Sequence, residues 1–264
     1  MKRLRLERDR LLVALAYFTR VPIPAWVGWS PDHLARASRY FPLVGLGVGI
    51  ANAAVLWAAA QAFPAVVAVL LSMSFSLMVT GAFHEDGLAD TADGLGGGYT
   101  PERVLEIMKD SRIGTFGSAA LLLSLALKAA LLTALTEHAT QLAMIALCLA
   151  HATSRWLPVE LMRWLSYVSD AAQARAKPVA EGIKMVDALV ARLTALAAGL
   201  WVLWTGALPA STLLAGLAGL LMLAVVIRQY LRQRIGGYTG DALGASQQLA
   251  ELLIYLVWVG SLSP

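Results

Sequence analysis

Two apolar stretches separated by one proline decide the fold class. Residues 41–63 read FPLVGLGVGIANAAVLWAAAQAF and residues 65–83 read AVVAVLLSMSFSLMVTGAF, with Pro64 between them. A helix needs about 20 predominantly apolar residues to cross a bilayer, so each stretch is long enough to span. Because proline breaks a helix, the pair predicts a tight transmembrane hairpin. Gly45 and Gly49 have the GxxxG spacing that lets helix backbones approach closely.

The overall composition also indicates a membrane protein. Of the 264 residues, 58% are hydrophobic and 14% are charged, and the mean hydropathy is +0.66. Soluble domains average about 45–50% apolar and about 25% charged residues. The single cysteine excludes a disulfide framework and a cysteine-rich metal site. Since no polar stretch is long enough for a second soluble domain, we expect one membrane domain over residues 1–264.

Further apolar runs continue the pattern along the chain. They cover residues 113–135, 140–161, 193–208, 210–227 and 249–262. The third and fourth of these runs form a second predicted hairpin around Pro209. The last run is short, so we predict seven spans and keep six as the alternative. The fold class is therefore an all-α, polytopic membrane helical bundle.

The distribution of basic residues predicts the orientation in the membrane. All but three of the 21 Lys and Arg residues lie in four segments, 1–40, 84–112, 163–190 and 228–247. By the positive-inside rule these segments face the cytoplasm. This pattern accounts for the net charge of +4 without a nucleic-acid partner.

Three cations, Lys128, Arg155 and Arg192, fall within or near the spans. We expect Lys128 to reach the outer face by snorkelling. Arg155 and Arg192 either snorkel or face a polar cavity.

The N-terminus combines a basic start with a short apolar run. Residues 1–10 are strongly basic and residues 11–18 are apolar, but Pro22 and Pro24 follow without a small-residue cleavage site. A signal peptide is therefore not expected. Because the run is too short to span, we predict an interfacial or re-entrant helix over residues 8–20 on the cytoplasmic side.

An acidic cluster directly follows the second predicted span. Asp86, Asp90 and Asp93 are spaced i, i+4 and i+7, which on a helix places three carboxylates on one face. Three anions so close repel one another, so the arrangement is costly unless a cation lies among them. Oxygen ligands of this kind suit Mg²⁺, with Mn²⁺ as an alternative, rather than zinc. We expect Gly87 and Gly94 to leave this face open to a phosphate.

A second polar segment lies at the start of the third span. Lys109 and Arg112 supply positive charge for phosphate oxygens, and Arg can bind them with two parallel hydrogen bonds. Ser111 and Thr115 either donate to phosphate or cap the following helix. Asp110 adds a carboxylate that a simple basic anchor does not explain.

Other polar residues have two interpretations each. His84 is either a general base for a hydroxyl nucleophile or a donor to an aspartate. Glu85 points about 100° away from Asp86 on a helix and is not expected to be a ligand. Asp241, in the segment GGYTGD, is either a metal ligand or part of a turn, and Arg155 is either an anion partner or a snorkelling cation.

Together these residues indicate metal-dependent phosphoryl transfer from a diphosphate. The candidate catalytic residues are His84, Asp86, Asp90, Asp93, Lys109, Asp110 and Arg112. The candidate substrate-binding residues are Gly94, Ser111, Gly114, Thr115 and Arg155. The candidate metal ligands are Asp86, Asp90, Asp93, Asp110 and Asp241.

These motifs resemble those of the bacterial cobalamin synthase family, the adenosylcobinamide-GDP ribazoletransferases. The resemblance covers essentially the whole chain, and the segments that carry it are 18–22, 40–45, 84–98, 106–117, 154–156 and 239–245. It implies a Mg²⁺-dependent enzyme of the bacterial inner membrane. In that reaction α-ribazole, or its 5′-phosphate, attacks the phosphoryl group bonded to cobinamide in adenosylcobinamide-GDP. GMP leaves, and adenosylcobalamin or its 5′-phosphate forms in the last assembly stage of vitamin B12 synthesis.

Two other functions are weighed against this one. Residues 90–94 are similar to the start of the CDP-alcohol phosphotransferase signature, but Leu95-Gly96-Gly97 stands where that signature has Ala-Arg. A cation-coupled transporter is the second alternative, although transporter sites usually lie near the membrane midplane. Association with other cobalamin-assembly enzymes is compatible with the resemblance, and the oligomeric state stays open.

Overall fold

The computed structural model describes residues 2–28, 31–169 and 183–262. Within these ranges the regular structure is helical apart from one isolated bridge between Tyr167 and Tyr238. The elements in chain order are α1 (Lys2–Phe18), α2 (Pro31–Ala37), η1 (Ser38–Tyr40), α3 (Phe41–Ala60), α4 (Ala65–Thr80), α5 (Phe83–Gly97), α6 (Pro101–Met108), α7 (Thr115–His138), α8 (Thr140–Ser154), α9 (Trp156–Trp164), α11 (Met185–Thr205), α12 (Ala210–Ile235) and α13 (Gly240–Gly260).

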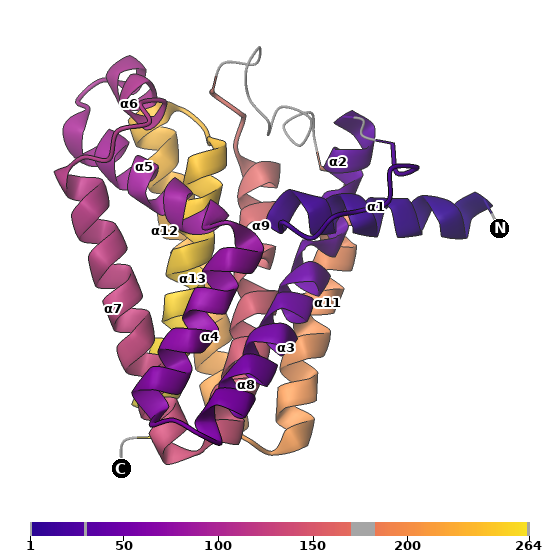
Figure 1. Ribbon diagram of the computed structural model, residues 1–264. Helices are drawn as coiled ribbons and strands as arrows, with labels where there is room; N and C mark the ends of the chain where they lie inside the picture. The colour runs from indigo at the N-terminus through magenta and orange to yellow at the C-terminus, as the bar shows by residue number, and fades with distance from the viewer. Residues whose placement is uncertain (1, 29–30, 170–182, 263–264) are drawn as a thin grey trace.

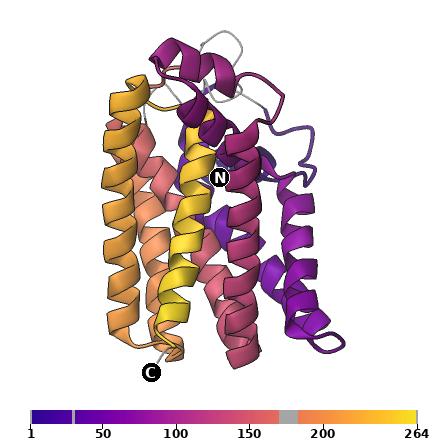
Figure 2. The same ribbon diagram turned by 90° about the vertical axis from the view of Figure 1, so that its left-hand side faces the viewer.

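The described helices confirm the predicted polytopic bundle. Six are long and apolar enough to cross a membrane, and the bent pair of α4 and α5 raises the number to seven. Figure 2 shows α12, α13, α7 and α4 standing side by side. The last span begins at Gly240 rather than at Leu249, because the side chain of Thr239 accepts a hydrogen bond from the Ala242 N–H and starts the helix earlier. Part of the predicted polar segment 163–190 lies outside the described residues.

Glycines bring α3 into close contact with α8. A Cβ on Gly49 would lie 2.8 Å from the carbonyl oxygen of Leu147, and one on Gly45 would collide with the carbonyl oxygen of His151. The absence of side chains at these two positions therefore allows the two backbones to touch. The predicted hairpin between α3 and α4 is also present, with Pro64 immediately before the first residue of α4.

A sharp bend separates α4 from α5. Gly81 and Ala82 both adopt the left-handed conformation, with φ of 66° and 55°, and the two helix axes differ in direction by 86°. This conformation costs little for glycine but about 1–2 kcal/mol for an L-residue such as alanine. The bend places α5 across the end of the bundle, whereas α4 runs beside α3 and α7 (Figure 1).

Helix α1 also lies across the bundle, at the end that carries α5 and α6 (Figure 1). We call this end, defined by α1, α5 and α6, the polar end; α13 ends at the opposite end. The helix begins earlier than the predicted 8–20, at Lys2. It is held by aromatic contacts, since the ring of Tyr17 stacks on that of Phe41 at 5.7 Å and Phe18 meets the same ring edge-on at 4.5 Å.

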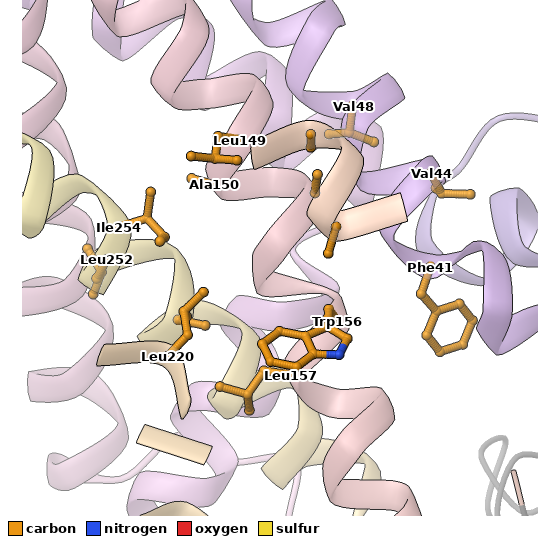
Figure 3. Packing of buried hydrophobic residues seen from close by; sticks show 14 of the residues in the cluster. Phe41, Val44, Val48, Leu149, Ala150, Trp156, Leu157, Leu220, Leu252 and Ile254 are labelled. Carbon is orange, nitrogen blue, oxygen red and sulfur yellow. The ribbon is translucent and has the colours of Figure 1, made fainter. Parts of the chain in front are cut away.

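The apolar core joins the spans below the polar end. Figure 3 shows Trp156 and Leu157 packed between Leu220 on one side and Phe41 on the other. Leu157 is fully buried and Leu220 almost so. Burial of a large apolar side chain contributes about 1.5–3 kcal/mol in water; in a bilayer, close packing rather than transfer from water supplies the gain.

Candidate active site

Helix α5 carries the predicted acidic cluster and gives its carboxylates different surroundings. Asp86 is exposed, Asp90 is half-buried and Asp93 is buried. Burial together with the nearby charges of Asp86, Asp241 and Asp93 raises the pKa of Asp90 to about 7. The charges of the other three aspartates therefore act on Asp90.

The first turn of α13 adds Asp241 to this group. Asp241 is half-buried and follows the Thr239 cap, so it belongs to the helix rather than to a turn before it. A Cβ on Gly87 would lie 2.8 Å from the carbonyl oxygen of Asp241, which shows how closely α5 and α13 approach here. We define the acidic face as Asp86, Asp90, Asp93 and Asp241.

The prediction that Gly87 and Gly94 leave the face open is wrong. Gly87 lies against the Asp241 backbone, and a Cβ on Gly94 would lie 2.5 Å from the side chain of Met108 and 3.0 Å from the carbonyl oxygen of Val104. Both glycines therefore allow a second helix to approach α5. A single helical sequence does not say which of its faces a neighbour covers.

Asp93 caps α7. Its carboxylate accepts hydrogen bonds from the N–H groups of Gly114 at 2.7 Å and Gly117 at 2.8 Å. These N–H groups belong to the first turn of α7, where no intrahelical partner exists. Thr115 is the first residue of this helix, so the capping role considered for it and for Ser111 belongs instead to a residue of α5.

The loop before α7 carries an exposed ion pair. The guanidinium of Arg112 donates to both carboxylate oxygens of Asp110, and its N–H groups approach them to 2.6–3.1 Å. This bonding lowers the pKa of Asp110 to about 2. Asp110 lies in the loop between α6 and α7, where its partner is Arg112, and not on α5 or the first turn of α13. Lys109 and Ser111 are exposed beside it.

His84 and Arg155 lie behind α5, toward the bundle interior. The His84 ring is buried and stacks on Phe18 at 5.2 Å. Arg155 is 1% exposed and donates to the Nδ1 atom and the carbonyl oxygen of His151 at 3.1 and 2.9 Å. Both residues line a small cavity together with Gln247. Arg155 therefore does not snorkel, and the structure does not bring either residue to the acidic face.

A buried polar network lies beneath α5 and was missed by the sequence reasoning. The ammonium of Lys128 on α7 donates to Gln248 Oε1 at 2.9 Å and lies 3.1 Å from Glu251 and 3.9 Å from Glu85. Lys128 is 7% exposed, so its predicted snorkelling to the outer face is wrong. The signal was present in Glu251, a carboxylate inside the last apolar run, because an ionisable group in a span usually has a partner.

The third intramembrane cation, Arg192, also has a buried partner. Its guanidinium makes two hydrogen bonds to the carboxylate of Glu160, both at 2.7 Å. Glu160 is 1% exposed and also accepts from Trp156 Nε1 at 2.9 Å. This pair connects α11 to α9, away from α5.

The donor set of the acidic face fits a hard divalent cation, since it consists of carboxylate oxygens. In the arrangement described here, no three His, Cys, Asp or Glu side chains within residues 2–28, 31–169 and 183–262 are close enough to hold a metal ion. Both carboxylate oxygens of Asp93 accept hydrogen bonds from α7, so Asp86, Asp90 and Asp241 are the better candidates for cation ligands.

The fold and the site define a multi-pass membrane protein with a carboxylate-rich face at one end of its helical bundle. A family model described as Cobalamin-5-phosphate synthase matches residues 10–259. The chain belongs to this family.

The sequences of curated relatives match this chain over nearly its full length. The adenosylcobinamide-GDP ribazoletransferase of Leptothrix cholodnii is 49% identical over 253 residues, which cover 96% of both chains. The protein of the same name from Vibrio cholerae is 46% identical over 256 residues, or 96% of this chain and 94% of the relative. The one from Ralstonia pickettii is 46% identical over 265 residues, or 99% and 100%. No solved structure matches the chain.

Proposed function

We propose that this protein transfers the phosphocobinamide group of adenosylcobinamide-GDP to α-ribazole or its 5′-phosphate. The observation that carries the proposal is the acidic face, in a chain whose relatives are named adenosylcobinamide-GDP ribazoletransferases. The hydroxyl oxygen of the ribazole forms a bond to the phosphorus attached to cobinamide. The bond from that phosphorus to the GMP oxygen breaks, and GMP leaves as the corrinoid product forms.

Asp86, Asp90 and Asp241 would hold Mg²⁺, or Mn²⁺ in its place, with Asp93 close by. The bound cation would neutralise diphosphate oxygens and polarise the phosphorus. The fit rests on the donor chemistry and on the crowding of these carboxylates, since burial and the charges of Asp86, Asp241 and Asp93 raise the pKa of Asp90.

The exposed loop before α7 binds the diphosphate in this proposal. Lys109 and Arg112 are both exposed, and Arg112 already binds a carboxylate through two nitrogens. A phosphate group offers the same bidentate geometry, so it can replace Asp110 as the partner of Arg112. Ser111 and Thr115 are exposed on the same segment and supply hydroxyl donors.

A carboxylate of the acidic face takes the proton of the attacking hydroxyl. His84 is the other candidate, but its ring is buried against Phe18 and its Nε2 atom lies within the bundle without a hydrogen-bond partner. A general base must come within hydrogen-bond reach of the proton that it abstracts. Asp86 and Asp90 meet this requirement more readily because they are exposed and half-buried, respectively.

The polar end faces the cytoplasm of the bacterial inner membrane in this proposal. Positive-inside orientation favours it, since α1 and the loop before α7 carry basic residues at that end. The water-soluble diphosphate substrate then reaches the acidic face directly from the cytoplasm.

The proposal is tested with the full-length protein in detergent, supplied with adenosylcobinamide-GDP, α-ribazole and Mg²⁺. We expect a corrinoid product and GMP in equal amounts, and no turnover after chelation of the metal. Absence of corrinoid product from folded protein contradicts the proposal. A phospholipid product from a CDP-alcohol, or cation flux in vesicles without chemistry, would identify the two alternatives.

Substitutions test whether the carboxylates of the acidic face matter more to turnover than a carboxylate elsewhere in the protein. Asp86→Asn or Asp90→Asn should lower turnover at least about 100-fold, the usual effect of removing an electrostatic contact to the transition state. Glu102→Gln is the matched control, because this exposed carboxylate of α6 loses the same charge away from the acidic face. Near-normal turnover of Asp90→Asn at limiting Mg²⁺ contradicts a ligand role for Asp90.

A further inference from the structure

The polar network beneath α5 connects three helices inside the bundle. Lys128 on α7 lies between Glu85 on α5 and Glu251 on α13, at 3.9 and 3.1 Å. Gln248 on α13 accepts from Lys128 at 2.9 Å and donates to Glu85 Oε1 at 3.0 Å. All four side chains are buried, with exposures from 2% to 7%. These contacts are therefore made away from bulk water, where they are not weakened by its screening.

Glu85 is the residue that joins this network to the acidic face. It directly precedes Asp86 in α5, but its carboxylate points toward α7 and α13. Helix α13 carries Asp241 in its first turn and Gln248 and Glu251 further along. The backbones of the two helices approach closely at Gly87 against Asp241 and at Gly244 against His84, and the Glu85 and Gln248 side chains add a hydrogen bond between them.

The close contacts of the two backbones limit how far α5 and α13 can approach. The hydrogen bonds from Asp93 to α7 hold the later part of α5. The bonded Glu85 side chain restrains rotation of the first turn of α5 about its axis, because turning the helix there pulls the carboxylate away from Gln248 and Lys128. Rotation of α5 also moves Asp86 and Asp90 relative to Asp241. Active-site groups must be held to within about 10–20° for productive geometry.

We propose that Glu85 and Lys128 form a buried positioning pair that sets the rotation of α5 and thereby aligns Asp86 and Asp90 with Asp241. The proposal rests on the proposed function of the acidic face as a divalent-cation site. Neither Glu85 nor Lys128 touches the cation or the substrate. They act through the orientation of the helix that carries two of the ligands.

The test measures Mn²⁺ affinity directly, by electron paramagnetic resonance of the purified protein in detergent, beside steady-state kinetics. Glu85→Gln keeps the shape of the side chain and an oxygen for Gln248, but removes the charge facing Lys128. We expect its Mn²⁺ affinity to fall about tenfold, within the range of coupling between contacting residues. At saturating metal its kcat should stay within about threefold of the wild type, since the ligands themselves are intact.

Lys128→Met and the double variant Glu85→Gln/Lys128→Met complete a cycle. Lys128→Met leaves Glu85 and Glu251 without their shared cation, so we expect a larger loss of Mn²⁺ affinity than in Glu85→Gln. In the double variant the loss should be smaller than the two single losses combined, because both changes disrupt one interaction. If Lys128→Met fails to fold, Glu85→Gln alone still decides the question.

The pair Glu160 and Arg192 is the matched control. It is also an ion pair between two helices with a buried carboxylate, but it joins α9 to α11 and does not touch α5. Arg192→Met should lower the melting temperature and leave Mn²⁺ affinity unchanged. The positioning role is overturned if Glu85→Gln and Lys128→Met lower only the melting temperature, as Arg192→Met does. Failure of the proposed function is a separate outcome, in which the wild type binds Mn²⁺ but forms no corrinoid product.

Discussion

Gly87 of α5 lies directly against the backbone of Asp241 in α13. A Cβ at position 87 would be 2.8 Å from the Asp241 carbonyl oxygen and 3.1 Å from its Cα. Real Cβ atoms essentially never approach backbone this closely, and backbone of a packed helix cannot turn aside as a flexible side chain can. The close approach of these two helices brings carboxylates from both of them into one site.

Gly87→Ala should therefore separate α5 from α13 and weaken the acidic face. Overpacking of this kind costs about 1–3 kcal/mol, so we expect a lower melting temperature together with a Mn²⁺ affinity reduced severalfold. Gly47→Ala is the control, because a Cβ there meets nothing within 4 Å. Equal Mn²⁺ affinity in both variants contradicts the importance of this contact.

Asp93 has a structural role, the capping of α7, that can be distinguished experimentally from metal binding. Asp93→Ala removes both acceptors for the first turn of α7 and should destabilise the protein by about 1 kcal/mol, as the loss of a helix cap does. Asp93→Asn keeps one acceptor oxygen and should recover part of this loss in thermal unfolding. Thr100→Ala, which removes the cap of α6, is the control for capping without a carboxylate. If Asp93→Asn binds Mn²⁺ as the wild type does, Asp93 is a cap and not a ligand.

The exposed pair of Arg112 and Asp110 predicts a kinetic effect without a loss of stability. Arg112→Ala should raise the KM for the diphosphate substrate about tenfold, corresponding to one charge-assisted hydrogen bond. Arg103→Ala removes an exposed cation paired with Glu106 on α6 and should leave KM unchanged. Asp110→Asn tests whether Asp110 does more than hold Arg112. Unchanged Mn²⁺ affinity in that variant would remove Asp110 from the metal ligands.

Attachment of α1 to the bundle should depend on pH through Glu7. Burial raises the pKa of Glu7, but hydrogen bonds and charge from Tyr40, Arg39 and Arg10 outweigh it and place the pKa below the ordinary 4.5. Because the folded pKa is the lower one, this stabilisation is present above pH 4.5 and is lost as the pH falls through the folded pKa. The aromatic contacts of Tyr17 and Phe18 with Phe41 do not depend on Glu7, so part of the attachment persists.

Hydrogen exchange of the α1 amides, corrected for intrinsic rates, measures this attachment. We expect protection to decrease between pH ~6 and pH ~3.5 in the wild type. Glu7→Gln should show weaker protection at the higher pH and little change between the two. Identical pH profiles for both proteins would exclude Glu7 as the titrating group.

The spans were predictable because a bilayer leaves few choices. Backbone groups in hydrocarbon must bond within their own helix, so apolar length and prolines such as Pro64 and Pro209 mark where each span starts and ends. The helical spacing of Asp86, Asp90 and Asp93 was equally readable, since it depends only on neighbours in the same helix. The prediction that the last span starts at Leu249 was wrong because Thr239, which caps the helix, lies outside the apolar run.

What could not be predicted depends on how the helices are rotated about their axes. Lys128 and Glu251 are far apart in the sequence, and their contact requires α7 and α13 to turn these faces toward each other. Asp93 looks like a third ligand from its spacing, but its partners are N–H groups of another helix. The helical spacing places Glu85 on a different face of α5 from Asp86 and so argues against it as a metal ligand. In the structure this other face meets Lys128.

The position of Lys128 also bears on how the protein is made. A lysine near the middle of a span costs about 2.5–3.5 kcal/mol during insertion, and α7 leaves the ribosome well before α13. Until the last helix arrives, Glu85 at 3.9 Å is the carboxylate available to this ammonium; Glu251 at 3.1 Å and Gln248 come with α13. Insertion of α7 is thus completed only when α13 is added. A nascent chain that ends before α13 therefore holds Lys128 inside the bilayer without Glu251 and Gln248 as partners.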